Sequence, residues 1–197
     1  MGGSTRAGTG GASLAQRAIA ATFGLLAVAA LLWAAVAIAD VISCNGGGKQ
    51  CNGTPFDDDI TGSRKADGIN AKAGQDDIYA KNGNDTVEGG DGVDYAEGGK
   101  GDDKLSGGDG DDTYLLGALW GGPGDDTLEG GDGADDLYGQ AGHDVLLGGP
   151  GDDQLDATGF GDNNVKDRLS CGGGFDVAFA TSKDRVPSDC EKVIAER

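Results

Sequence analysis

The stretch Gly89–Leu115 reads GGDGVDYAE, GGKGDDKLS, GGDGDDTYL, which is three consecutive units of nine residues. Each unit has the form G-G-x-G-x-D-x-U-x, where U is a large apolar or at least uncharged residue. A fixed period of this kind indicates a repeat architecture, in which one unit cannot bury its hydrophobic face alone and must stack on its neighbours. The other segments of the chain are therefore placed relative to this repeat.

The same phase extends in both directions from this stretch. Seven units precede an interruption at residues 116–120, four follow it, and all eleven keep an Asp at the sixth position and an uncharged, mostly aliphatic residue at the eighth. The units begin at residues 53, 62, 71, 80, 89, 98, 107, 121, 130, 139 and 148. Eleven units in phase are more than chance gives. Fainter copies follow at Asp167 with Leu169 and in CGGGFDVAF from Cys171.

Nine residues suffice for one short strand and one tight turn. Side chains of the D-x-U-x half alternate between the two faces of a strand, so the eighth residue of each unit is predicted to point inward. This internal ladder comprises Ile60, Ile69, Ile78, Val87, Ala96, Leu105, Tyr114, Leu128, Leu137, Leu146 and Leu155. The G-G-x-G half must bend sharply, and Gly reaches positive φ without steric cost. The predicted turn-shaping glycines are Gly74, Gly83, Gly92, Gly101, Gly110, Gly124, Gly133, Gly142 and Gly151.

The sixth-position aspartates are the candidate metal ligands. Two units make one coil, so alternate units stack with their Asp residues about 4.8 Å apart. Bare carboxylates in such columns repel each other, and Ca²⁺ takes about six to eight oxygens from carboxylates and backbone carbonyls, whereas Mg²⁺ prefers smaller octahedral sites. The columns are predicted to be Asp58–Asp76–Asp94–Asp112 and Asp67–Asp85–Asp103, followed by the pairs Asp126–Asp144 and Asp135–Asp153. Phe56 and Lys65 replace the fourth-position Gly in the first two units, which weakens the assignment of Asp58 and Asp67.

These repeats resemble the RTX family, the haemolysin-type nonapeptide calcium-binding repeats, over roughly residues 53–179. The resemblance implies an all-β, right-handed parallel β-roll with several calcium ions in its turns, bound by the sixth-position aspartates. Many RTX proteins join the repeats to a toxin, protease, lipase or epimerase domain, and these 197 residues leave no room for one. Many also use a C-terminal secretion signal, whereas an N-terminal signal is expected for this chain.

The composition is strongly acidic and rich in glycine, with 40 Gly residues and a formal net charge of −19. Such a composition is also typical of a disordered acidic linker. A linker, however, has no reason to keep an apolar residue in register with an Asp two positions before it. Without calcium, self-repulsion opposes collapse, so the free energy of metal binding is expected to be free energy of folding. The negative charge argues against nucleic acid as a partner.

Residues 18–39 form an uncharged apolar run that follows Arg17. The small-x-small sequence Ala37–Ala39 predicts a cleavage site, so residues 1–39 are interpreted as a secretory signal peptide. The run is also long enough to span a bilayer, which leaves an uncleaved signal-anchor as an alternative. A third option is lipidation at Cys44, because Val41–Cys44 looks like a bacterial lipobox. The repeats are then expected outside the cell or on its surface, with membrane contact only through this segment.

The four cysteines allow three disulfide connectivities, and exported proteins can keep disulfides. Proximity in the sequence favours Cys44–Cys51 and Cys171–Cys190, one clip at each end of the array. Zinc is the competing interpretation, but the sequence contains no C-x-x-C pair. The expected organisation is a leader at 1–39, an N-terminal cap at 40–52, calcium-binding repeats at 53–156, and degenerate repeats with a C-terminal cap at 157–197.

The sequence offers no catalytic constellation. His143 is the only histidine, which excludes an H-E-x-x-H zinc site, and no G-x-S-x-G elbow, P-loop or Rossmann fingerprint occurs. We therefore expect a non-enzymatic calcium-binding protein with a structural, adhesive or buffering role outside the cell. The alternative is an accessory or minimal domain of a secreted hydrolase.

Overall fold

The computed structural model describes residues 40–44, 50–113, 117–159 and 165–195. The chain divides into two units, Met1–Ala35 and Val36–Arg197, and all of the described residues belong to the second. The expected leader, residues 1–39, and the helix predicted within it lie outside the described residues. Within the described ranges, no helix is long and apolar enough to cross a membrane.

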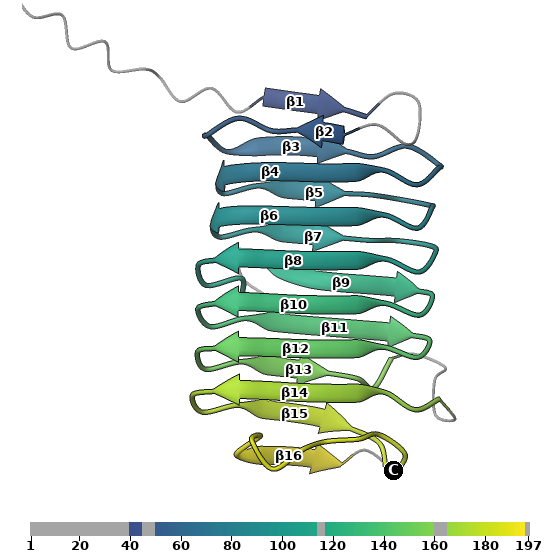
Figure 1. Cartoon of the computed structure of the whole chain (residues 1–197), viewed down its shortest axis with the longest axis vertical. Helices are drawn as coiled ribbons and strands as arrows, with labels where there is room; N and C mark the ends of the chain where they lie inside the picture. Colours follow the sequence, from purple (N-terminus) through teal and green to yellow (C-terminus); the bar gives the residue numbers. More distant parts are fainter. Residues whose placement is uncertain (1–39, 45–49, 114–116, 160–164, 196–197) are drawn as a thin grey trace, which may run out of the picture. The chain divides into compact units, whose positions relative to one another are not determined.

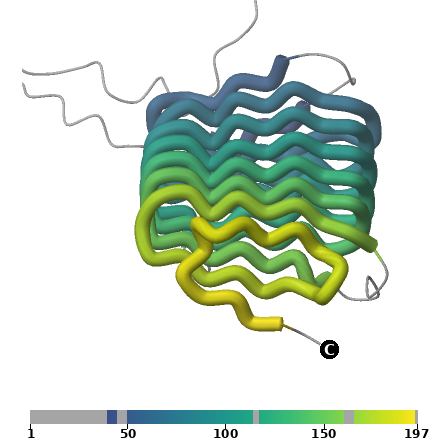
Figure 2. Tube along the Cα trace, turned by 60° about the horizontal axis from the view of Figure 1, so that its bottom comes forward, coloured from purple at the N-terminus to yellow at the C-terminus, as the bar shows by residue number. Residues whose placement is uncertain are grey.

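The described residues form a parallel β-solenoid of about eight turns that contains no helix. Except for the last strand, which pairs with the strand before it, successive strands alternate between two parallel sheets, so each coil contributes one strand to each sheet (Figure 1). The nine-stranded sheet contains, in spatial order, β1 (Asp40–Ser43), β3 (Asp58–Thr61), β5 (Asp77–Tyr79), β7 (Tyr95–Glu97), β9 (Ala118–Pro123), β11 (Asp136–Ala141), β13 (Gln154–Asp156), β15 (Val177–Ala180) and β16 (Lys192–Ala195). The seven-stranded sheet contains β14 (Arg168–Gly173), β12 (Val145–Pro150), β10 (Thr127–Asp132), β8 (Lys104–Asp109), β6 (Thr86–Gly92), β4 (Gly68–Gly74) and β2 (Gln50–Asn52). Figure 2 shows the coils stacked on one another as flattened loops, and the right-handed sense of the coil stays a prediction.

The strand register places the eighth residue of each unit over its equivalent in the next coil. Ile60 pairs with Ile78 in the nine-stranded sheet, and Val87 pairs with Leu105 in the seven-stranded sheet. Both rows face the space between the sheets, and the side chains in them are almost completely buried. Burying each such side chain stabilises the fold by about 1.5–3 kcal/mol. The core is therefore a double apolar ladder, one residue per unit.

One rung of this ladder differs from the prediction. Leu119 is buried and pairs with Ala96 and Leu137, whereas Tyr114, predicted for this rung, lies outside the described residues. The interruption therefore enters directly after Asp112, and not after the eighth residue of that unit. The physical reason is that Ala118–Gly122 (ALWGG) carries an apolar residue followed two positions later by the Gly pair, so it can form the strand and its turn.

Both disulfides form between cysteines that are close in the sequence. Cys44 bonds to Cys51 with a Cα–Cα distance of 5.7 Å, and Cys171 bonds to Cys190 with a distance of 5.2 Å. The local pairing predicted from the sequence is confirmed, and it leaves no thiolate for zinc. Cys51 also continues the apolar ladder, because it pairs with Ile69. Each bond therefore ties down an end of the solenoid, where a coil has a neighbour on one side only.

Candidate metal centre

The sixth-position aspartates form two columns along the turns of the solenoid. Each of them is at most 5 % exposed. From Asp76 and Asp85 onward, the Oδ1 atom of each Asp accepts a hydrogen bond from the backbone N–H of the Asp in the preceding coil, with N–O distances of 2.7–3.0 Å. One column contains Asp58, Asp76, Asp94, Asp112, Asp135, Asp153 and Asp176, and the other contains Asp67, Asp85, Asp103, Asp126, Asp144 and Asp167.

The two columns run through the interruption without a break. Asp103 donates its N–H to Asp126, and Asp112 donates to Asp135, although each pair is 23 residues apart instead of 18. From the sequence, the units after the interruption are predicted to form separate pairs. They are continuous in the structure because the five extra residues lie between a column Asp and the strand that follows it.

The columns also extend beyond the last predicted ligand, Asp153. Asp176 accepts from the N–H of Asp153, and Asp167 accepts from the N–H of Asp144. Both are buried. The signal for Asp176 was visible in the faded unit CGGGFDVAF, which keeps the Gly-rich turn and the Asp at its sixth position.

The second carboxylate oxygen, Oδ2, distinguishes most column aspartates from the first one in each column, Asp58 or Asp67. Oδ2 is buried and has no hydrogen-bond partner among the described residues in Asp76, Asp85, Asp94, Asp103, Asp126, Asp135, Asp153 and Asp176. In the units that begin with Gly, it faces that first residue, since a Cβ on Gly98 would lie 2.6 Å from Asp103 Oδ2. A buried polar atom without a partner is costly, and a buried charge more so. The donor set therefore fits a cation with a preference for oxygen.

The pKa values of the column carboxyls also indicate that a buried negative charge is unfavourable there. Burial is the main cause that raises the pKa of Asp94 to about 7 and that of Asp112 to about 8, from 3.8. The backbone hydrogen bond to Oδ1 acts in the opposite direction, and the neighbouring column carboxylates raise the pKa further. Without a cation these groups are stable in the folded state when they keep a proton, and a dication can replace several such protons at once.

The turns bring backbone oxygens close to the columns. All nine predicted turn glycines have positive φ, between 128° and 151°. A Cβ on Gly101 would lie 1.6 Å from the carbonyl oxygen of Gly83 in the preceding coil, so no side chain fits there. Among the described residues, no group of three or more Asp, Glu, His or Cys side chains is close enough to hold a metal ion. An ion bound by two column carboxylates would therefore need these carbonyl oxygens as further ligands.

The fifth-position acidic residues behave differently from their buried neighbours. Asp102 Oδ1 accepts a hydrogen bond from the N–H of Asp125 in the next coil, and Asp125 Oδ1 accepts from the N–H of His143. All three residues are exposed, so water solvates their polar atoms. These side chains form an outer row that needs no metal, and they provide matched controls for the inner columns.

The family model of the RTX calcium-binding nonapeptide repeat, in four copies, matches residues 52–87, 88–118 and 120–155, about half of the chain. The chain belongs to this RTX repeat family. RTX nonapeptide repeats bind calcium, and their β-roll is typically structural and not catalytic. The match ends before Asp167 and Asp176, which this RTX chain nevertheless adds to its columns. No curated protein matches the chain.

Proposed function

We propose that this RTX protein is an exported calcium-binding protein whose folding depends on calcium, with a structural, adhesive or buffering role outside the cell. The observation that carries this proposal is that eight of the column aspartates have a buried Oδ2 atom with no hydrogen-bond partner in the part of the chain that the structure describes. Several ions would be held by the interior column aspartates together with carbonyl oxygens of the turns. Calcium would supply the positive charge that allows these carboxylates to stack while ionised.

The dependence of folding on calcium follows from the arrangement of the columns. The carboxylates of successive coils approach each other only when the coils are formed, so an unfolded chain presents no such site. Calcium bound to the columns stabilises the folded state over the unfolded one by the free energy of binding. Extracellular modules bind calcium at roughly 10⁻⁴–10⁻³ M. Sites of this affinity would leave the chain loose inside the cell and fold it outside.

Export is supported by the apolar run at residues 18–39 and by the two disulfides, which persist in oxidising compartments. The structural, adhesive or buffering role is supported by the fold, since RTX β-rolls are typically not catalytic. An activity screen of the calcium-loaded chain against common hydrolase substrates tests the alternative, an accessory or minimal hydrolase domain.

A calcium titration of the chelator-treated chain, followed by far-ultraviolet circular dichroism, tests the proposal. We expect a cooperative rise of the β-sheet signal with calcium and a much weaker response to magnesium at the same concentration. A chain that keeps the same β-sheet signal after chelation, and does not respond to added calcium, would contradict the proposal.

A further inference from the structure

The first repeat coil, residues 53–70, satisfies its own column carboxylates. Asp58 Oδ2 accepts hydrogen bonds from the backbone N–H of Thr54, at 2.6 Å, and from its hydroxyl, at 3.1 Å. Asp58 Oδ1 accepts from the N–H of Asp40 at 3.2 Å. Both oxygens therefore have protein donors, unlike the Oδ2 atoms of interior aspartates such as Asp94 and Asp103, which have none within the described ranges.

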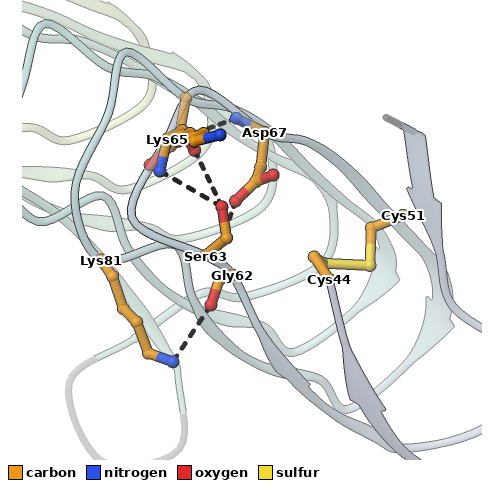
Figure 3. Close-up of a disulfide and its surroundings, with 8 residues drawn as sticks. Cys44, Cys51, Gly62, Ser63, Lys65, Asp67 and Lys81 are labelled. Atoms are coloured by element: carbon orange, nitrogen blue, oxygen red, sulfur yellow. Dashed lines mark hydrogen bonds between the residues drawn. A yellow bond between two sulfur atoms is a disulfide. The ribbon is translucent and has the colours of Figure 1, made fainter. Parts of the chain in front are cut away.

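The second unit of this coil repeats the arrangement. Asp67 Oδ2 accepts from the backbone N–H of Ser63 at 2.6 Å (Figure 3). The turns also differ in conformation, because Phe56 and Lys65 stand at the fourth position and neither has the positive φ of the interior glycines. The turn carbonyls of this coil are consequently not arranged as in the interior coils.

Two lysines of the following coil donate hydrogen bonds to backbone carbonyls of these turns. Lys72 Nζ donates to the carbonyl oxygen of Gly53, and Lys81 Nζ donates to that of Gly62 at 3.0 Å (Figure 3). Both occupy the second position of their unit, where the repeat has Gly, and both have positive φ, 89° and 85°. In an interior turn the equivalent carbonyl, Gly121 O, accepts from a backbone N–H.

The carbonyl group that accepts a hydrogen bond from Lys72 belongs to the same turn as the carboxylate of Asp58. Gly53, whose carbonyl binds Lys72, also adjoins Asp58, since a Cβ on Gly53 would lie 2.8 Å from Asp58 Oδ2. A lysine ammonium carries a permanent charge and three donors at neutral pH. It can therefore stabilise an oxygen-rich turn as a metal ion does, without a ligand from solution.

We propose that the coil formed by residues 53–70 holds no calcium, and that Lys72 and Lys81 provide its positive charge. Calcium sites then begin with the pairs Asp76–Asp94 and Asp85–Asp103. The proposal rests on the proposed function, and it departs from the family pattern, because Asp58 and Asp67 stand at ligand positions of the repeat but do not fit a metal.

Counting bound ions by native mass spectrometry at saturating calcium tests the first part. The variant Asp58→Asn/Asp67→Asn is expected to hold as many calcium ions as the unmodified chain. The matched variant Asp94→Asn/Asp103→Asn, which also changes one residue per column, is expected to hold fewer. A lower count in the first variant overturns the proposal. An unmodified chain that binds no calcium overturns the proposed function instead, so the two failures are distinguishable.

Thermal unfolding of lysine variants tests the second part and does not depend on the Asp variants being folded. Lys72→Met/Lys81→Met keeps side-chain length and backbone strain but removes both charges. We expect a lower melting temperature with an unchanged ion count, and recovery in Lys72→Arg/Lys81→Arg. Gln140→Met is the control, because Gln140 also has positive φ at a second position but carries no charge. A shift no larger than that of Gln140→Met overturns the role of the lysines.

Discussion

The first repeat coil and the middle of the solenoid share one backbone plan but balance their charges differently. Residues 53–81 contain six Asp residues and four Lys or Arg residues, two of which bind turn carbonyls. Residues 105–165 contain fourteen Asp and Glu residues and no Lys or Arg. In the first region the chain supplies its own cations, whereas in the second the positive charge has to come from solution.

This difference teaches that an Asp at the sixth position does not by itself define a calcium ligand. Asp58 and Asp103 are both buried, and the Oδ1 atoms of both accept a backbone hydrogen bond. Only Oδ2 separates them, since it has protein donors in Asp58 and none among the described residues in Asp103. We infer that the unsatisfied oxygen distinguishes a calcium ligand from the other sixth-position aspartates.

Removal of calcium is expected to have the largest effect. Chelation should abolish amide protection from hydrogen exchange over residues 105–156, because their stacked carboxylates lose the charges that hold them together. Part of the protection should persist at residues 50–70, because the disulfide, the two lysines and the backbone donors stabilise this coil without a metal ion. Hydrogen-exchange mass spectrometry before and after chelation measures both regions in one sample. If residues 50–70 lose amide protection before residues 105–156, the first coil depends on calcium more than the middle of the solenoid does, which contradicts the inference.

The pH dependence of the calcium-free chain should be the next largest effect. In the middle of the solenoid, burial raises the pKa of Asp126 to about 7 and that of Asp112 to about 8, from 3.8. Between about pH 4 and pH 8 the folded state therefore binds more protons than the unfolded chain, and the free energy of unfolding falls as pH rises. We expect more β-sheet signal at about pH 5 than at about pH 8 after chelation.

Circular dichroism of the chelated chain across this range measures the effect. With calcium present the direction should reverse, because calcium and protons compete for the same carboxylates and calcium binds more tightly as pH rises. A calcium-free chain with more structure at about pH 8 than at about pH 5 would show that the column carboxylates are not the groups that destabilise it.

The disulfide at the first coil gives an effect of intermediate size. Cys44→Ala removes the bond but keeps Cys51 at its place in the ladder. We expect a loss of about 2–3 kcal/mol in the free energy of unfolding, with the number of bound calcium ions unchanged. Chemical denaturation at saturating calcium measures the loss, and native mass spectrometry counts the ions. Fewer bound ions in this variant would mean that the first coil contributes to calcium binding, which contradicts the difference inferred between the first coil and the middle of the solenoid.

The fold and the interior of the columns were predictable because both depend on period and alternation. A nine-residue period with one apolar residue and one Asp at constant spacing determines which side chains face inward, and Ile78 and Asp76 lie accordingly. The place of the insertion was not predictable from spacing alone, since both Tyr114 and Leu119 are apolar enough for the rung. Only pairing with Ala96 and Leu137 distinguishes Leu119.

The ends of the columns were less accessible to sequence reasoning. The missing Gly at the fourth position indicated that Asp58 and Asp67 differ, but not which groups satisfy them. The donors come from Thr54 and Ser63, each two residues before that position, and neither contact belongs to the repeat pattern. At the other end, Asp176 is recognisable only when the array is extended beyond units that keep the full pattern.

A matched pair of adjacent residues should give the smallest effect, but also the most specific one. Asp103 Oδ1 accepts from Asp85 while its Oδ2 has no partner among the described residues, and the neighbouring Asp102 is exposed and accepts from Asp125. Asp103→Asn keeps the hydrogen bond to Oδ1 but replaces Oδ2 by an amide nitrogen, which repels a cation. We expect the calcium concentration at the folding midpoint to rise on the order of tenfold, because affinity follows the number of charged ligands.

Asp102→Asn also keeps its acceptor oxygen and loses one charge, but at a solvated position. Its effect on stability should stay within about 0.5 kcal/mol, as for most surface substitutions. Calcium titrations of both variants by circular dichroism, at equal ionic strength, make the comparison. Equal shifts in the two variants would mean that calcium responds to the overall charge of the turn, and not to the buried Oδ2 atom that separates the middle of the solenoid from its first coil.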